Sequence, residues 1–251
     1  MHEGKKIIIV MPAYNAEKTL EQTVRDIPQG FADEIILCDD GSHDRTVEIA
    51  KRLGLTVITH AVNKGYGANQ KTLYDAALAH GADIIVMVHP DYQYDPRVIP
   101  FAAGFLEKDI CDVIIGSRIR TRKETLQGGM PLYKYISNRF LTVVQNIALD
   151  QNLGDFHSGF RVFKRSVLEN IAYKNNSDDF IFDAECLAQA AFRGCRIGDI
   201  PIPTRYFAEA SSINFSRSLV YGLGCLAVSG KYLLQLWGLG HFKLFQPPPR
   251  S

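Results

Sequence analysis

The sequence lacks the cysteine patterns of metal-bound and disulfide-linked proteins. Its five cysteines are odd in number, and no Cys-x-x-Cys occurs. This spacing indicates neither a zinc site nor a disulfide framework, and it fits a reducing compartment. We expect most of them to be small core residues. They are Cys38, Cys111, Cys186, Cys195 and Cys225.

The glycines of a dinucleotide-binding turn are also missing. The motif Gly-x-Gly-x-x-Gly belongs after the first strand, where this chain has Met11-Pro12-Ala13-Tyr14-Asn15. A Gly-x-Gly further on, at residues 65–67, has Gln70 in place of the third glycine. No Walker loop occurs. The sequence therefore argues against a nicotinamide dehydrogenase and against a P-loop enzyme.

Charge of one sign does not dominate. The net charge is +1 over 251 residues, so no overall field points to nucleic acid. Residues 117–139, however, carry six Lys or Arg against the single acid Glu124. This basic stretch predicts an anionic ligand or surface, with a solvated face as the alternative. The chain enters an apolar run at once, which predicts no signal peptide and a cytoplasmic location.

Short apolar runs alternate with helical patterns in the first half of the chain. This alternation predicts a single Rossmann-like α/β domain with a mostly parallel central sheet flanked by helices. We expect it to cover residues 1–215. The expected strands are Ile7–Met11, Glu34–Cys38, Thr56–Thr59, Ile84–Val88 and Val113–Ile115, followed later by Ile197–Ile200.

The C-terminal part, residues 216–251, is expected to form an amphipathic helical tail. Its apolar stretch is interrupted by Lys231 and Gln235 and contains several glycines, which makes it a poor spanning helix. The composition suits a helix that lies on the cytoplasmic face of a membrane, with Trp237 near the lipid headgroups. Packing on the core or on a partner subunit, as in a homo-oligomer, is the alternative.

Polar residues gather where the predicted strands end. Ligands of parallel sheets bind beyond these carboxyl ends. Asp39 and Asp40 follow the second strand, and a carboxylate suits a ribose because it accepts from two hydroxyls. Lys64, before a glycine-rich helix start, suits a phosphate. Alone, an Asp-Asp-Gly sequence is more often just a turn, and the lysine alone is a weak signal.

The fourth strand ends in His89-Pro90-Asp91-Tyr92-Gln93. Residues two apart on an extended segment point to the same side, so His89, Asp91 and Gln93 form a candidate site for a divalent cation that clamps a diphosphate. Mg²⁺ and Mn²⁺ prefer oxygen ligands, and Mn²⁺ tolerates the histidine nitrogen better. The alternative is that His89 only ends the strand.

Together these motifs resemble the family 2 glycosyltransferases, especially the polyprenol-phosphate (dolichol-phosphate) mannose and glucose synthases. The likeness runs in order over roughly residues 6 to 215. It is strongest in the segments Met11–Glu17, Asp39–Ser42, Asn63–Gly65, Gly116–Arg118, Phe156–Arg161 and Asp199–Pro203.

The resemblance implies a GT-A fold and a nucleotide diphosphate sugar, either UDP- or GDP-linked. It implies that the nucleoside lies among Pro12, Tyr14, Glu17, Asp39 and Asp40. It places Arg118, Arg161 and Arg205 near the diphosphate or an acceptor phosphate. It also implies that His89, Asp91 and Gln93 occupy the metal motif. The family usually has Asp where this chain has His89, so a metal requirement is left open.

The resemblance also implies transfer with inversion at the anomeric carbon. A hydroxyl acceptor needs a general base, and Asp183 and Glu185 are the candidates. A phosphate acceptor needs none. The basic residues Arg118, Arg120, Arg122 and Lys123 favour a polyprenyl phosphate as the acceptor. A glycan or glycolipid hydroxyl is the alternative, as is a non-catalytic subunit that only binds nucleotide sugars.

Overall fold

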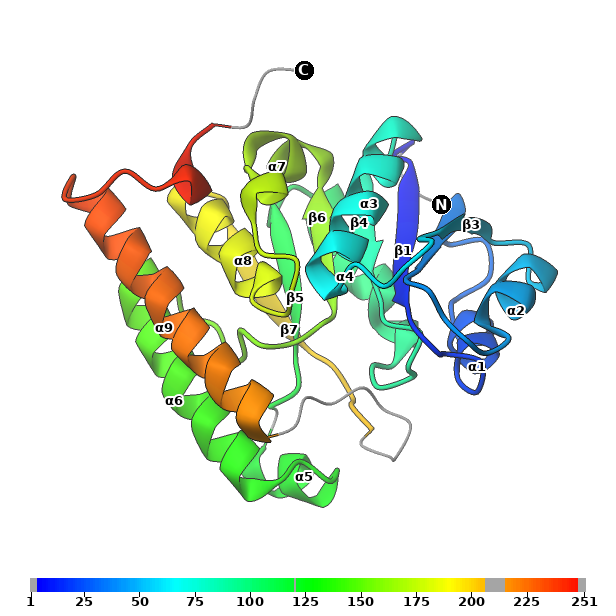
Figure 1. Ribbon diagram of the computed structural model, residues 1–251, viewed down its shortest axis with the longest axis horizontal. Helices are drawn as coiled ribbons and strands as arrows, with labels where there is room; N and C mark the ends of the chain where they lie inside the picture. Colours follow the sequence, from blue (N-terminus) through cyan, green and yellow to red (C-terminus); the bar gives the residue numbers. More distant parts are fainter. Residues whose placement is uncertain (1–3, 120, 206–214, 248–251) are drawn as a thin grey trace.

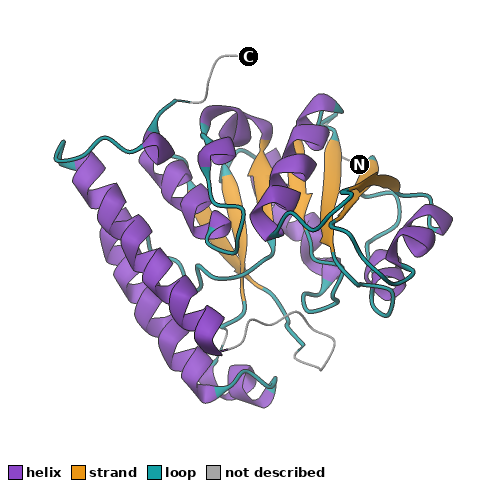
Figure 2. Ribbon diagram, in the orientation of Figure 1, coloured by secondary structure: helices purple, strands orange, loops and turns teal. Residues whose placement is uncertain are grey.

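A computed structural model describes residues 4–119, 121–205 and 215–247. Seven strands form one sheet in the order β3-β2-β1-β4-β6-β5-β7 (Figures 1 and 2). All neighbouring strands run parallel except those that pair with β6. The strands are β1 (Ile7–Ala13), β2 (Glu34–Asp39), β3 (Thr56–Thr59), β4 (Ile84–Met87), β5 (Val113–Ser117), β6 (Arg161–Lys164) and β7 (Ile197–Pro201).

Helices cover both faces of the sheet, which confirms the predicted single α/β domain. The α-helices are α1 (Leu20–Arg25), α2 (Thr46–Arg52), α3 (Tyr66–Ala79), α4 (Ile99–Glu107), α5 (Arg122–Gln127), α6 (Leu132–Leu149), α7 (Arg165–Asn170), α8 (Phe182–Phe192) and α9 (Phe215–Leu236). Three short 3₁₀ turns, η1 (Pro96–Val98), η2 (Tyr173–Asn175) and η3 (Lys243–Phe245), complete the described elements.

Strand β1 is covered by helices on both faces of the sheet. All seven of its residues are buried, as expected for a parallel strand covered on both faces. Its alternate side chains enter two separate cores. Ile7 and Ile9 pack with residues of α1, α2 and α4, whereas Ile8 and Val10 pack with residues of α3, α7 and α8. Because successive side chains of a strand point to opposite faces, the sheet has a core on each side and forms the middle layer of three.

Two elements differ from the sequence expectation. Residues Arg161–Lys164 form the antiparallel strand β6, which was not predicted, because a fully buried arginine breaks the apolar pattern. Residues Arg122–Gln127 form helix α5 instead of the loop expected for the basic stretch, with Thr121 accepting a hydrogen bond from the Glu124 amide at its start. Arg120 and residues 206–213 of the predicted loop lie outside the described residues.

Helix α9 packs beside α6 and along α8 (Figure 1). Cys225, Val228 and Tyr232 on one of its sides are buried, and the following Leu244 and Phe245 enter the core. By length and composition alone, residues 217–236 are apolar enough to cross a membrane, and about a fifth of that window is buried. The C-terminal segment therefore completes one face of the domain.

Gly67, in the first turn of α3, packs closely against the segment that leads into α8. A Cβ at Gly67 would lie 2.3 Å from the Ser177 carbonyl oxygen and 2.9 Å from Phe182 Cβ. We expect Gly67→Ala to lower the free energy of unfolding by about 1–3 kcal/mol, because backbone must shift to accept the methyl group.

The matched control is Gly104→Ala in α4, where an added Cβ meets nothing within 4 Å. There alanine should stabilise by about 0.5–1 kcal/mol through its helix preference. Urea unfolding of both variants measures the difference. Equal stabilities of the two variants would contradict the packing described for Gly67.

Candidate active site

The carboxyl ends of β1, β2 and β4 meet at one edge of the sheet, as the parallel register requires. Asp39 ends β2 beside Ala13 of β1. Its Oδ2 accepts hydrogen bonds from the amides of Gly41 (3.2 Å) and Ser42 (3.0 Å). Its buried Oδ1 has no hydrogen-bond partner in the described structure. Such an acceptor suits an N–H or O–H donor of a nucleoside.

Both carboxylate oxygens of Asp40 are hydrogen-bonded within the protein. One carboxylate oxygen lies 2.7 Å from His60 Nδ1 and accepts from the Lys64 amide, and the other accepts from the Gly65 amide (2.9 Å). The carboxylate therefore shapes the turn before α3. The Lys64 side chain is exposed at this turn.

The other predicted nucleoside residues surround the same edge. Pro12 is buried within β1, and Tyr14 is exposed just beyond it. Glu17 Oε2 accepts a hydrogen bond from the Arg45 amide and lies 3.5 Å from its guanidinium Nε. Tyr14 thus offers a ring surface for a base, whereas Glu17 fastens the β1 loop to the start of α2.

His89, Asp91 and Gln93 line one cavity beyond the end of β4. Asp91 Oδ1 accepts from the Gln93 amide (3.0 Å), and His89 Nε2 lies 3.0 Å from the Tyr66 hydroxyl. Nowhere in the described ranges do three His, Cys, Asp or Glu side chains form a metal-holding group. A Mg²⁺ or Mn²⁺ ion that keeps substrate phosphates needs only one or two protein carboxylates, and Asp91 fits this demand.

Arg161 does not line the cavity. Its guanidinium is fully buried and donates to the carbonyls of Phe156, Ser158 and Asp183 at 3.0–3.3 Å. Its Nε lies 3.6 Å from Asp183 Oδ1. Burial opposes the charge, yet the Asp183 carboxylate gives the Arg161 guanidinium a net raised pKa. Arg161 therefore positions the residues around the cavity instead of facing a phosphate.

Asp183 lines the cavity, whereas Glu185 does not. The Asp183 oxygens accept from Tyr66 Oη (2.8 Å) and Gln70 Nε2 (3.0 Å). Glu185 turns to the preceding loop, where it accepts from the Ser177 amide, and burial raises its pKa. Of the two predicted bases, only Asp183 lies where it can meet a substrate.

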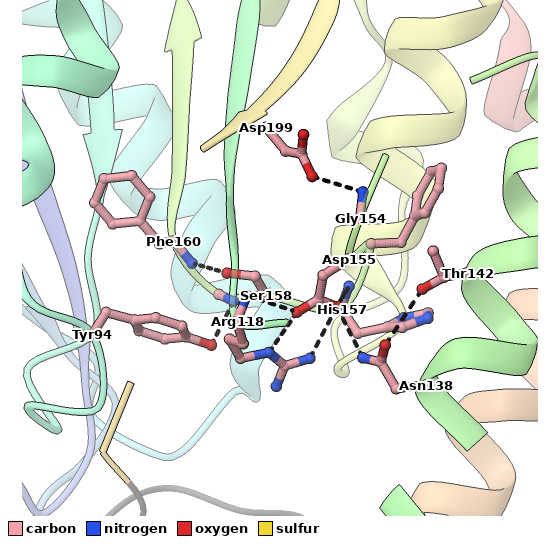
Figure 3. A network of polar contacts seen from close by, with 12 residues as sticks. Tyr94, Arg118, Asn138, Thr142, Gly154, Asp155, His157, Ser158, Phe160 and Asp199 are labelled. Carbon is pink, nitrogen blue, oxygen red and sulfur yellow. Dashed lines mark hydrogen bonds and ion pairs between the residues drawn. The ribbon is translucent and has the colours of Figure 1, made fainter. Parts of the chain in front are cut away.

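A second polar network borders the cavity (Figure 3). Arg118, after β5, donates to both oxygens of the buried Asp155, with Nε–Oδ2 at 2.7 Å and Nη2–Oδ1 at 3.1 Å. Asn138 of α6 and the His157 amide also donate to Asp155. Burial of Asp155 opposes its ionisation, yet the charge and hydrogen bonds of Arg118 hold the pKa of this carboxyl well below its usual range. His157 Nδ1 lies 3.0 Å from the Tyr221 hydroxyl and so links the network to α9.

Lys134 of α6 is a site residue that the sequence did not single out. It lines the cavity near Arg118 and has no hydrogen-bond or ion-pair partner in the described part of the chain. Burial, and then the positive charge of Arg118, lower the pKa of its ammonium group. Two neighbouring cations, one of them without a counter-charge, form a place for an anion.

The cavity has a volume of about 430 Å³ and a mixed lining. Its charged lining residues include Asp91, Arg118 and Lys134. Its apolar lining comes mostly from α6 and α9 and consists of Met130, Phe140, Leu141, Leu219, Leu223 and Leu226.

The remaining basic residues lie outside the cavity. Arg205 places its guanidinium 4.4 Å from the centre of the Tyr92 ring and 4.0 Å from Asp95. Arg122 and Lys123 are exposed in the first turn of α5. Neither group lines the cavity as described.

The fold and this strand-end site define a sugar-transferring enzyme of the GT-A class. The sequence model of the family described as glycosyl transferase family 2 matches residues 8–172. The chain belongs to glycosyl transferase family 2, and the predicted hexosyltransferase class is confirmed.

Curated relatives match most of the chain. It is 31% identical over 250 residues to the UDP-N-acetylglucosamine--dolichyl-phosphate N-acetylglucosaminyltransferase of Methanococcus voltae, covering 91% of this chain and 98% of the relative. It is 30% identical over 211 residues to the dolichyl-phosphate hexose transferase of Haloferax volcanii, covering 83% and 86%.

A solved structure supports the fold. Glucosyl-3-phosphoglycerate synthase from Mycobacterium tuberculosis, in complex with Mn²⁺, UDP and phosphoglyceric acid, superposes with a TM-score of 0.68. The alignment covers 95% of this chain and 80% of that one at 18% identity. Another structure of that enzyme contains Mg²⁺ and UDP.

The buried His157 predicts a pH dependence of stability. Burial, aided by Arg118 and Arg161, lowers the pKa of its imidazole from 6.5 to about 4, although Asp155 opposes the shift. In the unfolded chain the His157 imidazole therefore takes up a proton below about pH 6.5. In the folded chain it takes up this proton only near pH 4. Lowering the pH through this window must destabilise the fold.

We expect wild type to lose stability relative to His157→Gln as the pH falls from 7 to 4.5, because glutamine takes up no proton. Urea unfolding at several pH values measures this difference. Loss of the Tyr221 hydrogen bond adds only a constant offset. Parallel curves for the two proteins would show that His157 is not held neutral.

Proposed function

We propose that this enzyme transfers a hexose from a UDP- or GDP-linked donor to the phosphate of a polyprenyl phosphate. The observation that carries the proposal is the mixed lining of one cavity, which combines the unpaired positive charge of Lys134 with apolar side chains of α6 and α9. A lipid phosphate likewise combines a charged group with an apolar chain. The dolichyl-phosphate acceptors in the names of two relatives support this choice.

The donor is proposed to lie along the strand-end edge. Its nucleoside would meet Tyr14 and Asp39, and its diphosphate would extend toward Asp91. A divalent cation bound there supplies charge that stabilises the leaving diphosphate. Asp91 and His89 are the residues that would hold it, with Gln93 beside them.

Transfer then requires little proton chemistry. One acceptor phosphate oxygen attacks the anomeric carbon on the face opposite the diphosphate, the bond to the diphosphate oxygen breaks, and the nucleoside diphosphate leaves as an anion. A phosphate nucleophile has no proton to lose, so no base is needed. This agrees with Asp183, whose two oxygens already accept hydrogen bonds from Tyr66 and Gln70.

The acceptor proposal includes membrane contact. Helices α6 and α9 also expose apolar residues to the surface. Phe140, Leu219 and Leu223 among them border the cavity, and the others are Leu132, Ile136, Val143 and Ile147 on α6 and Val220 on α9, followed by Trp237. The α6 residues recur every three or four positions and so share one face. This face is proposed to rest on the cytoplasmic face of a membrane, where the lipid acceptor lies.

Lys134→Gln tests the acceptor site. We expect kcat/KM for a polyprenyl phosphate to fall about 10–100-fold, because hydrogen bonds to charged groups contribute about 1.5–3 kcal/mol. The KM for the nucleotide sugar should stay the same. Steady-state kinetics with each substrate varied in turn provides both values.

The matched control is Lys123→Gln, which removes the same charge from the exposed start of α5. It should leave both constants nearly unchanged. Equal losses in the two variants would mean that only the general basic field attracts the acceptor. An unchanged Lys134→Gln enzyme would place the acceptor elsewhere.

The membrane face is tested with Val143→Glu/Ile147→Glu. Each buried apolar side chain contributes about 1.5–3 kcal/mol, so binding to phospholipid vesicles should weaken at least about tenfold. Phe101→Glu is the control, since the exposure of Phe101 (72%) lies between those of Val143 (49%) and Ile147 (79%), but Phe101 belongs to α4, on the opposite face of the sheet. Wild-type protein that does not sediment with vesicles, or equal binding by both variants, would contradict membrane docking at this face.

A further inference from the structure

His89 takes part in a hydrogen-bonded chain that reaches from the cavity into the core. Its Nε2 lies 3.0 Å from the Tyr66 hydroxyl, and the two rings are parallel within 4°. The same hydroxyl lies 2.8 Å from Asp183 Oδ2. The chain therefore runs from Asp183 of α8 through Tyr66 of α3 to His89 after β4.

The direction of each hydrogen bond follows from the proton count. Asp183 Oδ2 accepts from the Tyr66 hydroxyl, and its Oδ1 accepts from Gln70 Nε2 and lies 3.6 Å from the guanidinium of Arg161. A carboxylate only accepts, so the single hydroxyl proton of Tyr66 goes to Asp183. The Tyr66 oxygen can then only accept from His89. The neutral imidazole is thus fixed with its proton on Nε2 and its lone pair on Nδ1.

Packing fixes the orientation of the same ring. A Cβ added to Gly159 would lie 2.6 Å from His89 Nε2 and 2.7 Å from Cδ2, so this edge of the ring rests against the glycine backbone. Nδ1 is the ring atom opposite that edge. It makes no hydrogen bond within the described residues, and it is not among the buried atoms that lack a partner. His89 shares the cavity wall with Asp91 and Gln93.

We propose that Asp183 and Tyr66 are positioning residues that hold His89 in the tautomer whose Nδ1 binds the divalent cation of the donor diphosphate beside Asp91. Histidines that bind metals regularly donate their other N–H to such a partner, which fixes the ring and strengthens the ligand. This inference rests on the nucleotide diphosphate donor of the proposed function, and it is independent of the acceptor.

The nitrogen ligand has a consequence for metal choice. Affinity of imidazole sites rises along the first-row series, whereas Mg²⁺ prefers oxygen ligands. An aspartate at position 89 would offer oxygen in place of nitrogen. This chain is therefore expected to favour Mn²⁺ over Mg²⁺, and His89→Asp should shift the preference toward Mg²⁺.

The experiment measures Mn²⁺ binding to the whole chain without any acceptor. Free Mn²⁺ is counted by electron paramagnetic resonance with Mn²⁺ alone, with UDP and with GDP. Pulsed measurements on the bound ion detect ¹⁴N coupling from a coordinated imidazole. We expect ¹⁴N coupling in wild type, its loss in His89→Asp with Mn²⁺ still bound, and loss of binding in Asp91→Asn.

Tyr66→Phe tests the positioning residues. Partners behind a metal ligand change metal affinity about 10–100-fold, so Mn²⁺ affinity should fall in that range and the ¹⁴N coupling should weaken. Tyr173→Phe is the matched control, because its hydroxyl also donates to a carboxylate, that of Asp75, but it does not line the cavity. It should bind Mn²⁺ like wild type.

Three results would overturn the inference: bound Mn²⁺ without ¹⁴N coupling in wild type, a Tyr66→Phe variant that binds Mn²⁺ as wild type does, or no Mn²⁺ binding under any of the three conditions. Binding of UDP or GDP without metal, measured by calorimetry, separates that outcome from failure of the donor proposal. Sugar transfer to a hydroxyl acceptor would contradict the proposed acceptor and leave this inference intact.

Discussion

The buried guanidinium of Arg161 is the constraint on which the site depends. An ionised group inside a protein costs several kcal/mol unless it is paired and hydrogen-bonded. Here the cost is offset by Asp183 on α8 and by the carbonyls of Phe156 and Ser158. The same arginine begins β6, the antiparallel strand between β4 and β5. One charge therefore ties the sheet, the loop before β6 and helix α8 together.

Both polar networks of the cavity extend from this centre. On one side, Asp183 reaches His89 through Tyr66. On the other side, the loop anchored by Arg161 carries Asp155 and His157, which hold Arg118 and contact Tyr221 of α9. The first network faces the proposed donor and its cation, and the second faces the proposed acceptor. In the proposed function, Arg161 would support both binding regions without contacting either substrate.

The sequence predicted the parts of the fold whose residues follow simple patterns. The short β-branched runs marked the parallel strands, and helix Phe182–Phe192 was expected with the bounds that it has. Strand β6 was missed because Arg161 occupies a buried position where the pattern demands an apolar residue. Helix α5 was missed because its first turn is charged and lacks an apolar stripe.

The sequence predicted those site residues that directly follow the ends of strands. Asp91 and Arg118 are examples, and both line the cavity. Lys134 and Tyr66 were not singled out, because their roles come from contacts with residues distant in sequence. For Asp40 and Arg161, the motif suggested a role that the fold does not support. Both were flagged as ligand-binding residues by motif, yet their polar groups bind the protein itself. A motif identifies residue types, and only the fold shows which way each group faces.

The central claim is that an acceptor phosphate, and no hydroxyl, attacks the sugar. The direct measurement uses a polyprenyl phosphate labelled with ¹⁸O on its phosphate oxygens, with mass spectrometry of the products. The account predicts a hexosyl-phosphate lipid that keeps all of the label, with none in the released nucleoside diphosphate. A product with the sugar on a hydroxyl, or hydrolysis of the nucleotide sugar alone, would contradict it.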